Sequence, residues 1–312
     1  PPDAADRRTV PLLLLCCLAF GASVRFIFVF QSDFPLNDGG MFYAMARDLQ
    51  RAGFVLPSFT TYNDMTIPFA YPPLGFYLAA LLQQAGVDLL ITFRFLPTLV
   101  SMLTILAFAA FGRAVLPSTT AWLCAVAAFA LMPRGFLWII MGGGLTRSLG
   151  FFFGLLALRQ TYLLYTRRDW RALPLAILWA GLTAMSHAEM AFFVFYSSAL
   201  FFLVFWRAWA GVGASLVAGL GTLAVSAPWW GSVLAHHGLA PFLAAGGTGG
   251  PPLMGALQLL LLLGDITEET PFALFGCLAL VGAVACIISR RYLLPGWVPV
   301  LFVVDPRSAR TT

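Results

Sequence analysis

"YPPLGFYLAALLQQAG", residues 71–86, decides how the rest of this chain is arranged. Its apolar part is well below the roughly 20 residues that a helix needs to cross a bilayer. Pro72 and Pro73 fix an extended backbone and then allow a helix to begin. We therefore expect a re-entrant or interfacial helix here, which stays on one face of a membrane.

The rest of the chain is far too apolar for a soluble domain. It has 312 residues, of which 60% are hydrophobic and 10% charged, and its mean hydropathy is +0.88. Soluble domains carry about 25% charged residues. We expect an all-α, polytopic transmembrane helical bundle with spans at residues 10–30, 95–115, 119–133, 145–166, 172–187, 188–206, 211–230, 271–290 and 292–304.

Charge sets the expected orientation. Arg7 and Arg8 precede the first span, so the positive-inside rule places the N-terminus in the cytoplasm. If 71–86 stays outside, the arginines of the later turns fall inside and most acidic residues fall outside. We expect one transmembrane domain over residues 1–312, with 31–94 as the first extracytoplasmic loop and 95–304 as the remaining spans. The expected location is the cell membrane of a prokaryotic cell envelope, with the active face extracytoplasmic.

The two ends of the chain bear on whether it is a fragment and on whether it begins with a signal peptide. The start "PPDAADRRTV" and the end "VVDPRSARTT" are typical of a fragment. Residues 11–30 favour a membrane anchor over a signal peptide, because the run is long and lacks a small-residue cleavage site.

All 18 basic residues are arginine, which excludes lysine-dependent Schiff-base and P-loop chemistry. The net charge of +5 indicates membrane orientation and not nucleic-acid binding.

The first loop contains "NDGGMFYAMARDLQRAG", residues 37–53. Phe42, Met45 and Leu49 recur at helical spacing while Asp48 lies on another face, which predicts an amphipathic helix at the membrane surface. Asp38 precedes this helix. It is either only an N-cap for the helix or a functional carboxylate facing the outside.

Two further stretches predict an anion site on the same face. "MGGGLTRSLGFFFGLL", residues 141–156, places Gly143, Gly144 and Arg147 at a helix start, where backbone N–H groups and a guanidinium can bind phosphate. The alternative is a tight turn whose arginine reaches the lipid headgroups. Arg307 in "DPRS", residues 305–308, could hold a lipid phosphate through a bidentate fork.

"MSHAEMAFF", residues 185–193, interrupts two apolar runs with His187 and Glu189. Ionisable residues at membrane depth are costly and often functional. The two side chains could form a ligand pair for a divalent metal ion, contact a sugar or an acceptor, or simply mark a polar turn between helices. Tyr71 belongs to the interfacial aromatic belt.

The order of these motifs resembles a known family. "NDGG" after a first span, then "YPPLGFYLAAL" and "RFLPTLVSMLTILAFAAFGRAVL", is similar to the GT-C-type integral membrane glycosyltransferases. The most similar branch is that of the dolichyl-phosphate-mannose-protein mannosyltransferases and aminoarabinose transferases. Two features depart from the family pattern: Asp-Gly-Gly replaces Asp-Glu in the first loop, and no acid follows the third span.

The resemblance implies a sugar transfer at the extracytoplasmic face, with inversion at the anomeric carbon. The donor would be a polyprenyl-phosphate-linked sugar and the acceptor a hydroxyl. Asp38 matches the catalytic aspartate, and Arg147, the glycines and Arg307 would neutralise the departing phosphate. The alternatives are a non-catalytic GT-C-like protein that binds lipid-linked sugar, and a transporter or flippase, which would place polar groups near the bilayer midplane.

Overall fold

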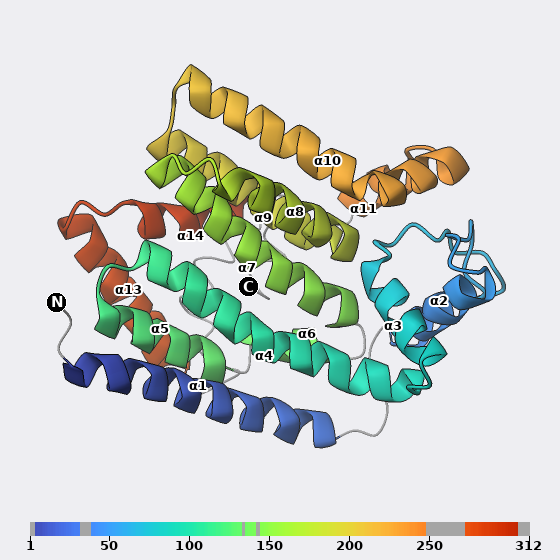
Figure 1. The fold of residues 1–312 in the computed structure, drawn as a ribbon, viewed down its shortest axis with the longest axis horizontal. Coiled ribbons are helices and arrows are strands. Elements are labelled where there is room, and N and C mark those ends of the chain that lie inside the picture. Colours follow the sequence, from blue (N-terminus) through green and yellow to red (C-terminus); the bar gives the residue numbers. More distant parts are fainter. Residues whose placement is uncertain (1–3, 32–38, 133–134, 142–143, 248–271, 305–312) are drawn as a thin grey trace.

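The computed structural model describes residues 4–31, 39–132, 135–141, 144–247 and 272–304. Its architecture is all-α (Figure 1). The part of the chain that it describes contains no β-strand, only an isolated antiparallel bridge between Phe59 and Pro68. The helices are α1 (Ala4–Phe30), α2 (Gly39–Arg51), α3 (Leu74–Gln84), α4 (Leu89–Val115), α5 (Thr119–Leu131), α6 (Leu137–Ile140), α7 (Gly144–Arg167), α8 (Ala172–Ser186), α9 (Ala188–Phe205), α10 (Trp209–His237), α11 (Ala240–Gly247), α13 (Phe272–Ile288) and α14 (Leu293–Val304).

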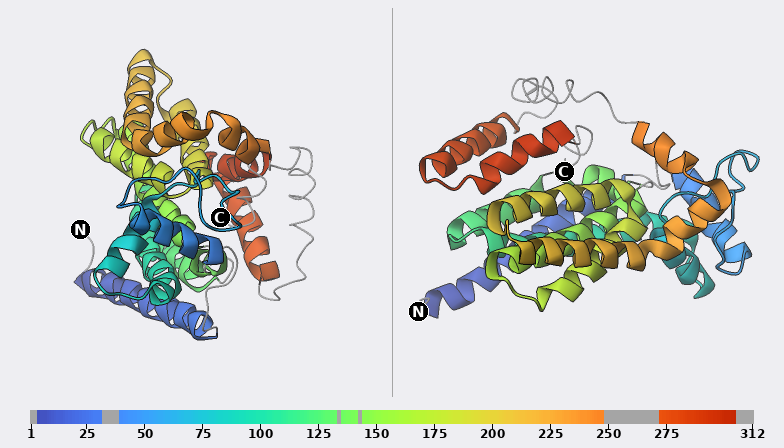
Figure 2. Two further views of the ribbon diagram at one scale, coloured as in Figure 1. Left: turned by 90° about the vertical axis from the view of Figure 1, so that its right-hand side faces the viewer. Right: turned by 90° about the horizontal axis from the view of Figure 1, so that it is seen from above.

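The long helices lie side by side and alternate in direction, while α2 and α3 lie together at one end of the bundle (Figures 1 and 2). We call this the α2/α3 end. The start of α7, the α8–α9 junction and the far end of α10 also lie there. The other end carries the α4–α5, α7–α8 and α9–α10 turns. Segments that are distant in sequence therefore meet at the α2/α3 end.

Four helices are long and apolar enough to cross a membrane, which indicates an integral membrane protein. They are Thr9–Phe30 in α1, Leu89–Val115, Ala188–Phe205 and Trp209–His237. Shorter apolar helices occur at Thr119–Leu131, Ala172–Ser186 and Leu278–Ile288. The all-α bundle is thus confirmed, and four of the nine expected spans meet both criteria.

Helix α7 forms the centre of the bundle, where it packs against α4, α8 and α9. It is more polar than its neighbours, and its Thr146, Ser148, Gln160 and Thr161 are all buried. Ser148 and Thr161 satisfy their hydroxyls by donating to carbonyls of their own helix. A helix with so many polar side chains suits the interior of a bundle better than a lipid-facing position.

Helices α2 and α3 differ in part from the sequence expectation. The expected apolar face of α2 is correct: Phe42, Met45 and Leu49 are at most 1% exposed. However, this face packs against protein, including Phe76 of α3 and residues of α4, and is not left for lipid. Helix α3 has 11 residues, too few for a crossing, as the sequence predicts.

The expected position of Asp48 on a polar face of α2 is wrong. It was expected on a face away from the apolar residues, but it is only 5% exposed. Its carboxylate accepts hydrogen bonds from Thr60 Oγ1 at 2.8 Å and from the backbone N and Oγ1 of Thr61 at 2.7 Å each. These bonds satisfy the buried charge and hold the 57–70 loop against α2.

Arg25 is a second buried charge, with no signal in the sequence, and it is fully buried in α1. Its guanidinium donates to Ser101 Oγ at 2.9 Å, to Gly21 O at 2.9 Å and to Ala130 O at 2.7 Å, and it lies over the ring of Phe136. Ala130 is in the last turn of α5, where the helix dipole is negative. The charge is therefore stabilised by a helix end and an aromatic face, and it joins α1 to α4 and α5.

Candidate functional site

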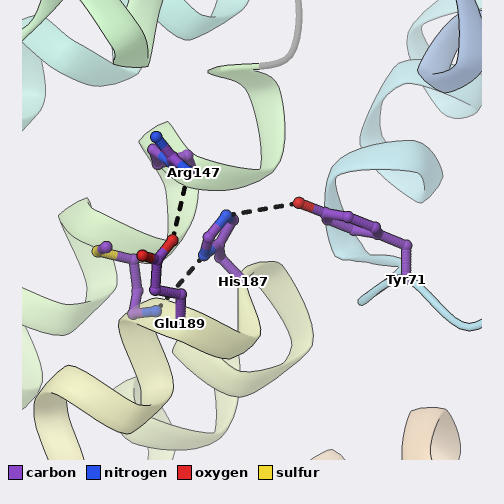
Figure 3. A network of polar contacts seen from close by, with 5 residues as sticks. Tyr71, Arg147, His187 and Glu189 are labelled. Atoms are coloured by element: carbon purple, nitrogen blue, oxygen red, sulfur yellow. Dashed lines mark hydrogen bonds and ion pairs between the residues drawn. The ribbon is translucent and has the colours of Figure 1, made fainter. Parts of the chain in front are cut away.

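Four of the side chains singled out from the sequence meet at the α2/α3 end (Figure 3). Tyr71 precedes α3, Arg147 lies in the first turn of α7, and His187 and Glu189 lie at the α8–α9 junction. Tyr71 Oη is 3.5 Å from His187 Nε2, and Arg147 Nη2 is 3.3 Å from Glu189 Oε2. We call these four residues the polar cluster.

The position of His187 is set by the break between two helices. Its backbone is extended, with φ −157° and ψ 119°, so α8 ends at Ser186 and α9 begins at Ala188. The imidazole Nδ1 accepts the backbone N–H of Met190 at 3.4 Å, which caps α9 as serine or aspartate does in other helices. The proton of a neutral imidazole then lies on Nε2, which donates toward Tyr71 Oη.

Two features keep His187 neutral. The first is this cap, because a doubly protonated imidazolium cannot accept a hydrogen bond. The second is burial, which lowers the pKa of His187 from 6.5 to about 3, with a smaller lowering from the nearby Arg147 charge. His187 is therefore a fixed hydrogen-bond donor near neutral pH and not a proton carrier.

Gly150 allows α7 to approach this junction closely. A Cβ atom at position 150 would lie 2.7 Å from His187 Cβ and 3.3 Å from Met190 Cβ. Real carbon atoms in van der Waals contact lie about 3.5–4.0 Å apart. A glycine one turn after Arg147 thus sets the distance between the guanidinium and the α8–α9 junction.

The Arg147–Glu189 pair is the charged part of the polar cluster. The two side chains are 24% and 21% exposed, so solvent or a ligand can reach them. Glu189 lies in the first turn of α9, where a negative charge is favourable. Within the described part of the chain, Glu189 is the one hydrogen-bond partner of the Arg147 side chain.

Tyr71 connects the cluster to three other elements. Its ring contacts Phe42 of α2, with centroids 5.0 Å apart, and Phe76 of α3 at 6.1 Å. The preceding residue, Ala70, accepts a hydrogen bond from Trp229 Nε1 of α10 at 3.1 Å. Because Phe42 is one turn from Gly39, the start of α2 is tied to the polar cluster.

The remaining predicted residues divide into two groups. Gly144 is present as the first residue of α7, but its N–H donates to Met141 O at 2.6 Å and is not directed at a ligand. This donor is used by the turn before α7, while the role of Gly144 in an anion site stays a prediction. Asp38, Gly143 and Arg307 lie outside the described residues.

The metal hypothesis gains no support from the described residues, which contain no group of three or more His, Cys, Asp or Glu placed to hold an ion. His187 Nδ1 caps α9 and Glu189 pairs with Arg147. The side chains of His187 and Glu189 therefore contact different partners, Tyr71 and Arg147.

Two residues of α10 support the site through partners that are distant in the sequence. Trp229 is 159 residues from its acceptor at Ala70. His237, also on α10, has Nε2 2.6 Å from Ser58 O and stacks its ring edge-on with Phe59. Together these contacts fix both ends of the 57–70 loop to α10, and this loop leads directly into Tyr71.

The chain has no detectable match among characterised families. A scan against protein-family models finds no match, and a search of curated proteins finds no significant one. Function is therefore inferred from the geometry of the polar cluster and of the residues around it.

Proposed function

We propose that this protein is a membrane glycosyltransferase. It moves a sugar from a polyprenyl-phosphate donor to an acceptor hydroxyl at the extracytoplasmic face. The observation that carries the proposal is the meeting of Tyr71, Arg147, His187 and Glu189 from three separate segments at one end of a membrane bundle. A partly exposed arginine beside a neutral histidine is suited to binding a phosphate at a lipid surface.

The distribution of arginine supports the assignment of this end to the outside. The turns at the opposite end of the bundle are rich in arginine, and the positive-inside rule would place them in the cytoplasm (Figure 1). These arginines are Arg113, Arg167, Arg168, Arg171 and Arg207. With this orientation the polar cluster faces the extracytoplasmic side.

The proposed reaction gives each group a defined task. The acceptor oxygen forms a bond to the anomeric carbon as the bond from that carbon to the phosphate oxygen breaks, and the electron pair leaves with the phosphate. Arg147 stabilises the negative charge that develops there. Asp38, one residue before the start of α2, takes the acceptor proton. His187 holds Tyr71, whose phenol orients the substrate.

Reconstituted protein tests this proposal directly. The full chain in proteoliposomes would be given polyprenyl-phosphate sugars and a cell-envelope extract as acceptor, and the release of polyprenyl phosphate measured. Asp38→Asn should lower turnover about 10²–10⁴-fold, the usual contribution of a general base. Arg147→Gln should weaken donor binding, whereas the matched control Arg113→Gln, at the opposite end, should not.

Transfer at the wild-type rate by Asp38→Asn would exclude the proposed base. Donor binding by the wild type without any turnover would instead favour the non-catalytic relative. Movement of the intact lipid-linked sugar across the membrane would favour a flippase.

A further inference from the structure

The Arg147–Glu189 ion pair is looser than a settled ion pair should be. Charge-assisted N–H···O bonds are about 2.7–2.9 Å long, whereas the Arg147 Nη2–Glu189 Oε2 distance is 3.3 Å. Both side chains are between a fifth and a quarter exposed. The pair is part-buried, but solvent still reaches it and only one long contact forms; fully exposed pairs contribute below about 1 kcal/mol. Glu189 therefore holds Arg147 only weakly.

Charge balance makes Glu189 an obstacle to anion binding. With His187 neutral, the polar cluster carries one positive charge, on Arg147, and one negative charge, on Glu189. A phosphate that approaches Arg147 would meet the Glu189 carboxylate at the same guanidinium. Like charges this close repel, so phosphate binding is favoured when the carboxylate withdraws.

Glu189 has a favourable place to withdraw to. It lies in the first turn of α9, whose N-terminal end favours a negative charge with or without Arg147. Separation from Arg147 therefore does not leave the carboxylate without stabilisation. At this position the Glu189 carboxylate also stays close to the anion that takes its place on the Arg147 guanidinium.

We propose that Glu189 is a displaceable counterion: the phosphate of the lipid-linked donor takes its place on Arg147, and the released carboxylate remains at the start of α9 beside the bound sugar. This deepens the proposed function and rests on it. Glu189 then acts as a positioning residue that holds Arg147 before the donor arrives and accepts sugar hydroxyls afterwards. It would also lower the affinity for other anions, which must displace the same carboxylate.

The proposed exchange of Glu189 for phosphate is tested by whether Glu189→Gln strengthens or weakens the binding of a polyprenyl phosphate. Equilibrium binding of a radiolabelled polyprenyl monophosphate to the full chain in nanodiscs is measured for the wild type and for Glu189→Gln. Removing the competing carboxylate should tighten binding about two- to fivefold. Arg147→Gln should weaken binding about tenfold or more. The control Asp169→Asn removes one negative charge in the α7–α8 turn at the opposite end and should leave affinity unchanged.

Glu189→Asp provides a second variant if Glu189→Gln does not fold. It keeps the charge at the start of α9 but withdraws the carboxylate by one methylene, and it should also tighten binding. A polyprenol without phosphate and inorganic phosphate are measured in parallel. Equal affinity for inorganic phosphate would overturn the lipid part of the proposal.

The outcomes separate the exchange from the proposed function. Weaker binding by both Glu189 variants, with wild-type binding intact, would show that Glu189 supports Arg147; the exchange would be wrong while the proposed function stands. No binding of the polyprenyl phosphate by the wild type would overturn both.

Discussion

Replacing Gly150 with alanine tests whether the close approach of α7 to the α8–α9 junction builds the polar cluster. The new Cβ would lie 2.7 Å from His187 Cβ, about 1 Å closer than carbon atoms pack. Both partners are attached directly to backbone, so α7 and the junction have to separate. The Tyr71 Oη–His187 Nε2 distance of 3.5 Å is already at the limit of hydrogen-bond range, so a shift of the junction would alter this contact.

We expect this overpacking to lower the free energy of unfolding by about 1–3 kcal/mol. Binding of the polyprenyl phosphate should also fall, because the start of α7 carries Arg147. Thermal unfolding in detergent and equilibrium binding measure the two effects.

Two glycines serve as controls. Gly154→Ala, one turn further along α7, meets a methyl group of Val194 at 3.3 Å, compared with 2.7 Å at position 150, and should cost less than Gly150→Ala. Gly219→Ala on α10 meets no atom within 4 Å and should be neutral or stabilising by up to about 1 kcal/mol. If Gly150→Ala matches Gly219→Ala in both assays, the packing argument is wrong.

Three further changes follow from the site. Because the pKa of His187 is lower in the folded than in the unfolded chain, its stabilising effect is complete above pH 6.5 and declines toward pH about 3, by about 1.4 kcal/mol per unit. His187→Asn keeps a cap for α9 but should flatten this decline in pH-dependent unfolding; an unchanged slope would contradict the neutral imidazole. Asp48→Asn should cost about 1.5–3 kcal/mol and make the 57–70 loop sensitive to limited proteolysis, since Thr60 and Thr61 lose a charged acceptor; equal cleavage rates would refute this. Trp229→Phe removes the bond to Ala70 O and should cost about 0.5–1.5 kcal/mol; an unchanged unfolding midpoint would show that α10 does not hold the loop.

Helix positions were readable from the sequence where apolar runs end in arginine or a capping residue. The expected spans 145–166 and 172–187 differ from α7 and α8 by one residue at each end at most. The span expected at 95–115 begins six residues earlier, at Leu89. Arg94 precedes the expected start but lies within the helix, where Val29 O and the rings of Phe30 and Phe95 accommodate its charge. A neighbouring helix supplies that environment, and the sequence does not reveal it.

The polar cluster was predicted as a set but not as pairs. Polar residues at alternate span ends must reach the same end of an up-and-down bundle, which is why Tyr71, Arg147, His187 and Glu189 could be grouped. Their partners depend on side-chain directions at a helix start. A shared metal ion was one of the alternatives for His187 and Glu189, yet one faces Tyr71 and the other Arg147.

Buried charge was the least predictable feature, because sequence patterns assign charged residues to water by default. Asp48 and Arg25 are both buried. The Asp48 carboxylate accepts from Thr60 and Thr61 of the following loop. The Arg25 guanidinium donates to Ala130 O at a helix end, although its Nη2 has no hydrogen-bond partner among the described residues. The Asp48 bonds hold the loop that leads to Tyr71, and the Arg25 bonds join the helix before the first loop to α4 and α5. Both buried charges therefore hold in place the segments on either side of the first loop, which contains the proposed base Asp38. This structural role explains why the unfavourable burial of the two charges is tolerated.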